Sequence, residues 1–111
     1  MTEINIPFSR EMAIAAIEGR KIATTRSEPK GKVGDTFKIY HPEWVHLRCV
    51  APATFCLIDI WVTGLEAVRG KYYRLEGFNS PEDFEKTWRT LHRGHFTTNK
   101  PYYIHFFGRV I

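Results

Sequence analysis

The chain has 111 residues, enough for one hydrophobic core and too few for two, so we expect a single domain over residues 1–111. Its composition, 43% hydrophobic and 25% charged, is typical of a globular protein. Sixteen Lys and Arg against twelve Asp and Glu give a net charge of +4, which permits nucleic-acid binding without requiring it. No leader-like or membrane-spanning apolar run is present, so we expect a soluble, cytoplasmic protein.

The first part of the chain predicts a short strand, a helix and a turn. Residues 4–8 alternate between apolar positions and polar or proline positions, which is typical of a strand. Ser9 can cap a helix, because its hydroxyl can accept a hydrogen bond from the first turn. Apolar residues recur at helical spacing over 12–17, and Gly19 is typical of the residue that ends a helix.

The middle of the chain predicts two strands. Gly34 marks the start of a strand that runs to Ile39. Residues 41–53 contain two prolines and are not assigned to an element. Residues 54–68 are apolar and β-branched on both faces, which predicts a central strand with a kink at Gly64.

The last part of the chain predicts a second helix and a final strand. Residues 72–78 favour a helical or turn segment, and Ser80 followed by Pro81 is a strong helix start. We expect this helix to pack an apolar face on the sheet and to end at Gly94. Residues 102–107 predict the final strand. The apolar face consists of Phe84, Trp88 and Leu91.

Residues 19–26, directly after the first predicted helix, are the densest group of polar side chains. The run Gly-Arg-Lys-Ile-Ala-Thr-Thr-Arg has three cations and two hydroxyls, which favours a site for an anionic or carbonyl-bearing ligand. If the chain is extended after the glycine, Thr24 and Arg26 project to the same face, and Lys21 in the turn can reach over them. The alternative is that Lys21 and Arg26 are solvated surface cations, which is the commoner state of such residues.

This run fits the pattern G-x-K-x-x-x-x-R and resembles the signature of the ASCH domain family, which belongs to the PUA-like superfamily. The Glu-Gly-Phe run at 76–78, with the helix start that follows it, is similar to the family's second landmark. The resemblance implies an α+β fold, a small mixed PUA-like β-barrel of about five or six strands with two flanking helices. It also implies binding of RNA or a nucleoside in a cleft beside the motif loop.

Within the family, the run is most similar to that of the N4-acetylcytidine amidohydrolases, Gly-Arg-Lys-Thr-x-Thr-x-Arg, with Ile22 in place of the first threonine. That resemblance implies Lys21, Thr24 and Glu76 as catalytic residues that hydrolyse N4-acetylcytidine to cytidine. A partly desolvated lysine has a lowered pKa and can act as a base, and a threonine hydroxyl needs such a base to be a nucleophile. Glu76 could hold the lysine, move a proton or accept an exocyclic N–H. The alternative for Glu76 is a surface acid near a helix start.

The resemblance supports a second class of function, a non-catalytic RNA-binding module. Cations of the run and of the segment after it would contact phosphates, while aromatic rings would stack on unpaired bases. For each ring, the alternative is a place in the hydrophobic core. The predicted RNA- or ligand-binding residues are Gly19, Arg20, Arg26, Lys30, Lys32 and Tyr72, with Lys38, Tyr73 and Trp44 as further candidates.

A third function, a ribonuclease, depends on His92 and His95, and such activity has been ascribed to some ASCH proteins. Two histidines can transfer protons by general acid–base catalysis. Their spacing also permits a metal, but no acid or thiol is near them in sequence. Cys49 and Cys56 have no neighbouring Cys or His at zinc-ligand spacing, so we expect both to be reduced, structural thiols. We therefore expect no metal and no other cofactor. The alternative for both histidines is a surface position favoured by a helix C-terminus.

Overall fold

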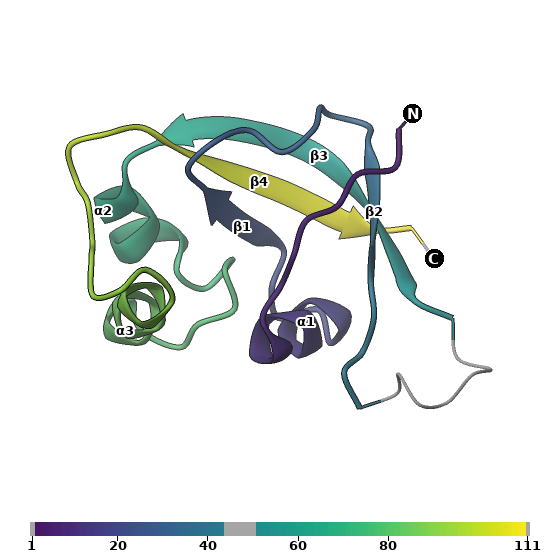
Figure 1. Cartoon of the computed structure of the whole chain (residues 1–111), viewed down its shortest axis with the longest axis horizontal. Helices are drawn as coiled ribbons and strands as arrows, with labels where there is room; N and C mark the ends of the chain where they lie inside the picture. Colours follow the sequence, from purple (N-terminus) through teal and green to yellow (C-terminus); the bar gives the residue numbers. More distant parts are fainter. Residues whose placement is uncertain (1, 44–50, 111) are drawn as a thin grey trace.

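The computed structural model describes residues 2–43 and 51–110 of the chain (Figure 1). Two of the candidates above, Trp44 and Cys49, and most of the unassigned segment lie outside these ranges. None of the helices in the described ranges is both long and apolar enough to cross a membrane. The elements in chain order are α1 (Arg10–Ile17), β1 (Ala23–Arg26), β2 (Thr36–Ile39), β3 (Ala53–Thr63), α2 (Leu65–Ala67), the π-helical turn η1 (Val68–Tyr72), α3 (Pro81–Leu91) and β4 (Tyr102–Arg109).

The four strands form one antiparallel sheet in the order β1-β4-β3-β2. The last strand of the chain, β4, therefore lies between β1 and β3, and β1 is an edge strand. A register shift between Leu57 and Asp59 interrupts the β3–β4 pairing. In Figure 1 the long strands curve over the helices, so the sheet forms a half-barrel. Over the residues that the structure describes, the expected barrel of five or six strands with two helices is corrected to a curled four-stranded sheet with three α-helices.

Residues 4–8 do not form the expected opening strand. Their alternation is real, because Ile6 is buried and its neighbours Asn5 and Pro7 are exposed. Next to the sheet there is only an isolated parallel bridge between Glu3 and Thr36 among the described residues, in which the N–H of Ile4 donates to the carbonyl of Thr36 at 2.8 Å. Pro7 has no N–H to donate to a neighbouring strand. The alternation therefore reports burial rather than strand pairing.

The predicted strand over 54–68 is also corrected at its C-terminal end. β3 ends at Thr63, and Gly64 is the N-cap of α2 rather than a kink in the strand. Leu65 and Val68 are fully buried one helical turn apart. A continuous apolar run does not distinguish a buried strand from a buried helical turn, which explains the error.

Both predicted helix starts are confirmed. The hydroxyl of Ser9 accepts a hydrogen bond from the N–H of Met12 at 3.4 Å, and that of Ser80 accepts one from Asp83 at 3.1 Å. These bonds satisfy N–H groups that have no partner within the first turn of a helix. The two caps therefore determine the residues at which α1 and α3 begin.

The predicted apolar face of α3 is confirmed for two of its three residues. Phe84 and Trp88 are buried and pack with α2, η1 and the start of β4 rather than with the middle of the sheet. Leu91 is 59% exposed, and the helix ends there, three residues before Gly94.

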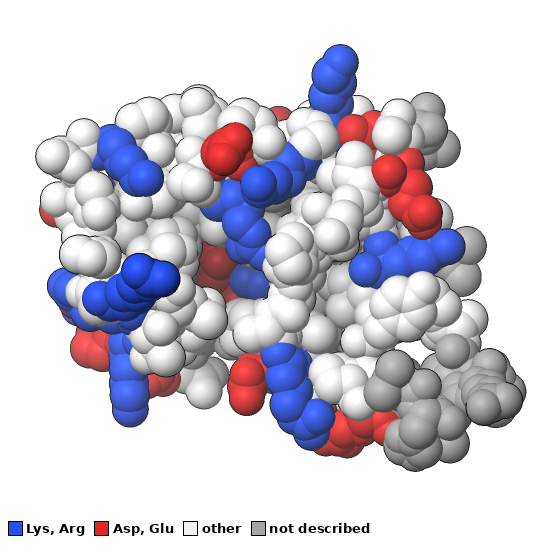
Figure 2. Space-filling model, viewed as in Figure 1, with Lys and Arg blue, Asp and Glu red and all other residues white. Residues whose placement is uncertain are grey.

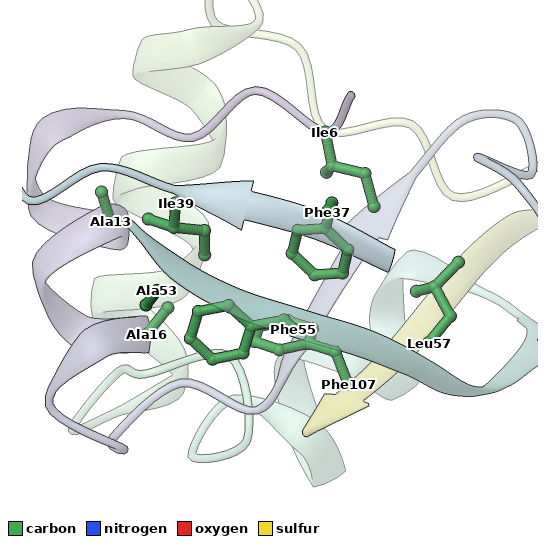
Figure 3. Close-up of a cluster of buried hydrophobic side chains, with 9 residues drawn as sticks. All are labelled: Ile6, Ala13, Ala16, Phe37, Ile39, Ala53, Phe55, Leu57 and Phe107. Carbon is green, nitrogen blue, oxygen red and sulfur yellow. The ribbon is translucent and has the colours of Figure 1, made fainter. Parts of the chain in front are cut away.

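The described residues form two hydrophobic clusters that stabilise the fold. In the first, which we call the sheet cluster, rings from β2, β3 and β4 meet with centroids 5.4 to 5.7 Å apart (Figure 3). The sheet cluster comprises Ile6, Ala13, Ala16, Phe37, Ile39, Ala53, Phe55, Leu57 and Phe107. The second, the helix cluster, comprises Leu65, Val68, Phe84, Trp88 and Tyr102.

Candidate functional site

A cavity of about 740 Å³ is lined by rings that belong to or pack on both clusters. Phe8 packs against the sheet cluster, whereas Phe78 packs against the helix cluster and Trp88 belongs to it. Sites for small molecules commonly measure roughly 300–1,000 Å³ and combine apolar walls with a few convergent polar groups. Figure 2 shows a hollow in the middle of the face turned toward the viewer, with atoms of basic and acidic residues at its bottom. The polar lining includes Lys21, Thr24, Thr25, Arg26, Lys30 and Glu76.

A buried ion pair forms the floor of the cavity. The ammonium of Lys21 donates to Oε1 of Glu76 at 3.1 Å and to the backbone carbonyl of Glu76 at 3.0 Å. The side chains are only 3% and 4% exposed. Burial lowers the pKa of Lys21, and the carboxylate of Glu76 opposes this shift. Lys21 is therefore nearer to the neutral, basic form than a surface lysine is.

Two turns bring this pair together across 55 residues of sequence. Gly19 ends α1 with a φ of +84°, and the chain then enters β1 beside the segment that carries Glu76. The N–H groups of Ile22 and Ala23 both donate to the carbonyl of Leu75, at 2.8 and 3.0 Å. The two halves of the site are thus joined by backbone as well as by side chains.

Gly77 allows the segment after Glu76 to lie close to Lys21. Its φ is +95°, a conformation that glycine adopts without steric cost. A Cβ at this position would lie 3.1 Å from the Cβ of Lys21 and 3.4 Å from that of Ala15. The Glu-Gly-Phe run therefore has a physical basis, since the glycine turns the chain directly after the carboxylate.

Two hydroxyls of β1 lie beside the ion pair, and each has a different partner. Thr25 donates to Oε2 of Glu76 at 2.7 Å, so both carboxylate oxygens are engaged. Thr24 instead accepts a hydrogen bond from the guanidinium of Arg26, as expected if both project to one face. Among the described residues, Lys21 and Thr24 line the same cavity but share no hydrogen bond.

The guanidinium of Arg26 is fixed by backbone carbonyls. It donates to the carbonyls of Pro7 at 2.7 Å and of Thr25 at 3.0 Å, and it lies 5.5 Å from the ring centroid of Phe8. Burial lowers the pKa of Arg26, but a guanidinium stays charged at any physiological pH. Arg26 therefore places a permanent positive charge against the hydroxyl of Thr24.

His105 supports the site from β4. Its ring is fully buried, and Nδ1 lies 3.2 Å from the carbonyl of Thr24 and 3.0 Å from that of Tyr103. Nε2 accepts a hydrogen bond from the N–H of Lys30 at 2.9 Å. Because Nε2 accepts, the ring is neutral with its proton on Nδ1, in agreement with a pKa lowered by burial. The ring thereby ties the strand that carries Thr24 to the loop that carries Lys30.

Four residues of the predicted binding set lie outside the cavity lining. Gly19 forms the turn after α1, and Arg20 pairs with Glu18 on the surface. Lys32 is exposed. The ring of Tyr72 packs against that of Trp61, with the ring centroids 6.3 Å apart. The histidines also separate. His92 lines the cavity and its ring stacks on Trp88, whereas His95 lines only a smaller neighbouring cavity.

Sequence reasoning did not select Thr25, Phe8 or His105 for the site. Thr25 adjoins a selected residue, but alternation along an extended chain places only Thr24 and Arg26 on the selected face. Both Thr24 and Thr25 are nevertheless buried, and both line the cavity. No spacing in the sequence signals His105, since its partners are backbone groups. Within residues 2–43 and 51–110, no group of three His, Cys, Asp or Glu side chains could hold a metal ion.

No protein-family model and no curated protein matches the chain. Solved structures do match. The ASCH domain from Lactobacillus crispatus JV V101 superposes with a TM-score of 0.70 at 10% identity, over 97% of this chain and 78% of that one. Two variants of ZmASCH from Zymomonas mobilis give TM-scores of 0.65 and 0.66 at 18% and 21% identity. They cover 99% and 96% of this chain and 76% and 68% of their own. The chain therefore has the fold of an ASCH domain, as its motif predicted.

Proposed function

We propose that the cavity binds a pyrimidine nucleoside, free or within RNA, and hydrolyses an N4-acyl amide such as that of N4-acetylcytidine. The observation that carries the proposal is the buried pair of Lys21 and Glu76 beside two threonine hydroxyls. Burying an ion pair costs desolvation energy, and a well-packed apolar pair of similar volume is often at least as stable. Chemistry at the floor of the cavity explains why such groups are placed there.

The walls suit a flat, polar ring. A pyrimidine can pack against Phe8 and Phe78, since aromatic rings prefer offset or edge contacts with centroids roughly 4.5–7 Å apart. Arg26 and Lys30 can donate to the base carbonyl or to a phosphate. The acyl group would then lie over the floor, next to Thr24.

In the proposed reaction, the oxygen of Thr24 attacks the acyl carbon. The guanidinium of Arg26 donates to that oxygen, so it stabilises the negative charge that develops when the hydroxyl loses its proton. The ammonium of Lys21 first passes a proton to Oε1 of Glu76, its partner in the buried pair. The resulting neutral amine then takes the proton of Thr24 through a water molecule or the substrate, because the two residues make no direct hydrogen bond. Lys21 then protonates the departing N4 amine, the C–N bond breaks, and water hydrolyses the acyl-threonine ester.

Thr25 and Glu76 offer a different route at the same floor. Thr25 already donates to the carboxylate, so Glu76 could take its proton as general base. The two routes predict different losses. Thr24→Val abolishes turnover by the first route, and Thr25→Val abolishes it by the second.

The test is incubation of the purified protein with N4-acetylcytidine, with cytidine release followed by chromatography. We expect turnover by the wild type and a loss of at least about 100-fold in Lys21→Met and Thr24→Val. Thr24→Ser keeps a hydroxyl and should retain part of the activity. The matched control is Lys32→Met, which removes an exposed lysine outside the cavity. No turnover by the wild type, or equal turnover by Lys21→Met, rules out the catalytic proposal.

A non-catalytic RNA-binding module is the second candidate. The observation that favours it is that Lys21, Glu76 and Thr25 satisfy one another's hydrogen bonds, which suits a rigid binding floor. Binding led by phosphates must weaken as salt rises, with a slope of roughly −0.7 per contact for single strands. A ribonuclease that uses His92 and His95 has less support, since only His92 lines the larger cavity.

A further inference from the structure

A second cavity of about 330 Å³ adjoins the first at the C-terminal end of α3. The two cavities share three lining residues, Trp88, Leu91 and His92. The rings of Trp88 and His92 stack at 4.1 Å with an interplanar angle of 11°. The wall between the cavities is thus a pair of stacked rings, held by a hydrogen bond of 2.8 Å between Nδ1 of His92 and the carbonyl of Trp88.

The second cavity is basic. Besides the shared residues, its lining consists of Arg93, His95, Thr97, Lys100 and Tyr102, so no carboxylate is among the residues described there. Arg93 and Lys100 form no ion pair within the described ranges, and the ammonium of Lys100 lies 5.0 Å from the ring centroid of Tyr102. Elsewhere on the surface, Arg69 and Arg89 are both paired with Glu85. The cations of this cavity are therefore available to an anion.

The backbone of the turn is fixed in an uncommon conformation. Arg93 has a φ of +56°, and it is the one non-glycine residue with a positive φ in the described ranges. Residues other than glycine rarely adopt such a conformation, and it recurs at functional sites. Gly94 donates to the carbonyl of Arg89 at 2.7 Å and accepts from its guanidinium at 2.8 Å. The turn is held from both sides, and it keeps Arg93 at the cavity.

We propose that this second cavity binds a phosphate attached to the nucleoside in the first, so that the ligand is a nucleotide or an RNA strand rather than a free nucleoside. The inference rests on the proposed function, because it takes the larger cavity as the base site. Arg93 and Lys100 supply charge-assisted hydrogen bonds to the phosphate, and the hydroxyl of Thr97 supplies a neutral one. The stacked rings of Trp88 and His92 separate base from phosphate.

The test compares equilibrium binding of cytidine, cytidine 5′-monophosphate and a short oligocytidylate at two salt concentrations, because these ligands share one base and carry no acyl group to hydrolyse. The monophosphate separates a terminal phosphate from a phosphodiester. The variant is Arg93→Gly with Lys100→Met, because glycine accepts the positive φ and Met keeps the contact with Tyr102. The matched control is Lys32→Ala with Lys71→Ala, which removes two exposed cations outside both cavities.

We expect the variant to lose about tenfold or more in affinity for at least one phosphate ligand, with its salt slope reduced by roughly 0.7 per lost contact. Its affinity for cytidine should stay within about twofold of the wild type, which also shows that it is folded. The inference is overturned if phosphate ligands bind no better than the nucleoside, or if the variant and the control lose affinity equally. If the oligonucleotide binds through Arg93 and Lys100 but N4-acetylcytidine is not hydrolysed, the phosphate site stands and the proposed hydrolysis fails.

Discussion

Two ion pairs made by neighbouring residues show how differently one short segment is used. Arg20 pairs with Glu18, two positions away, and their side chains are 55% and 53% exposed. Lys21 pairs with Glu76, 55 positions away, and their side chains are 3% and 4% exposed. The N–O distances are similar, 2.7 and 3.1 Å. The environment, and not the contact itself, separates a surface pair from the floor of a cavity.

The difference teaches what each pair contributes. An exposed pair is solvated whether or not it forms, so it contributes roughly 0–1 kcal/mol. A buried pair must offset the desolvation of both charges, and removing one partner leaves the other charge uncompensated. Among the described residues, no buried side-chain nitrogen or oxygen lacks a hydrogen-bond partner. Every buried polar group of the floor therefore has a partner, and we expect the loss of any one of them to lower the free energy of unfolding.

The largest expected effect is the loss of one member of the buried pair. Glu76→Gln should lower the free energy of unfolding by about 3–5 kcal/mol, because the ammonium of Lys21 would stay buried without its counter-charge. Urea denaturation at neutral pH measures the change. Glu18→Gln is the matched control in the surface pair and should change stability by less than about 1 kcal/mol.

The double variant Lys21→Met with Glu76→Leu sharpens this contrast. It replaces both charges by apolar groups, so most of the lost stability should return although the proposed hydrolysis does not. Equal effects of Glu76→Gln and Glu18→Gln would contradict the comparison, because burial would then make no difference.

A smaller effect is expected where the backbone approaches the buried lysine. Gly77→Ala strains a φ of +95° and places a methyl group 3.1 Å from the Cβ of Lys21. We expect a loss of about 1–3 kcal/mol in urea denaturation. Gly34→Ala is the matched control, because Gly34 has the same φ and nothing within 4 Å of the added Cβ.

The difference between the two glycine variants isolates the contact with Lys21 from the cost of the φ angle. Gly77→Ala should also disturb the proposed hydrolysis, which Gly34→Ala should leave unchanged. If both variants lose the same stability and keep the same activity, the close approach of Gly77 does not position Lys21.

Sequence patterns predicted the parts of this site that are local. Capping by Ser9 and Ser80 needs only neighbouring residues, and both helix starts were confirmed. The resemblance of the motif to the ASCH signature also predicted the ASCH fold, although the expected numbers of strands and helices were wrong. The strand predicted over residues 4–8 was wrong, because an alternating pattern indicates which side chains are buried and not whether the backbone N–H groups pair with another strand.

The hydrogen-bond partners of the side chains in the floor could not be predicted from the sequence. Whether Thr24 or Thr25 reaches Glu76 depends on how an edge strand is set against a segment 51 residues away. Alternation selects one face of β1, but the cavity and the sheet bury both threonines. His105 was not selected because its three partners are backbone groups, which leave no pattern in side-chain identity.

The smallest expected effect is the dependence of stability on pH that the buried, neutral ring of His105 introduces. Because burial lowers its pKa, the unfolded chain binds a proton at a higher pH than the folded chain does. The stabilisation is thus complete above the ordinary histidine pKa of about 6.5, and it is lost as pH falls from there through the folded-state pKa. Arg26 opposes protonation by its charge, and Glu76 favours it.

A proton on Nε2 would also face the N–H of Lys30, so the hydrogen bond that holds this loop would break. The loss is worth about 1–2 kcal/mol, and hydrogen exchange of the Lys30 amide should accelerate at low pH. His105→Gln should flatten the fall in stability below about pH 6.5. An unchanged pH profile in His105→Gln would mean that the buried ring does not sense pH, and that the loop beside Arg26 is held by other contacts.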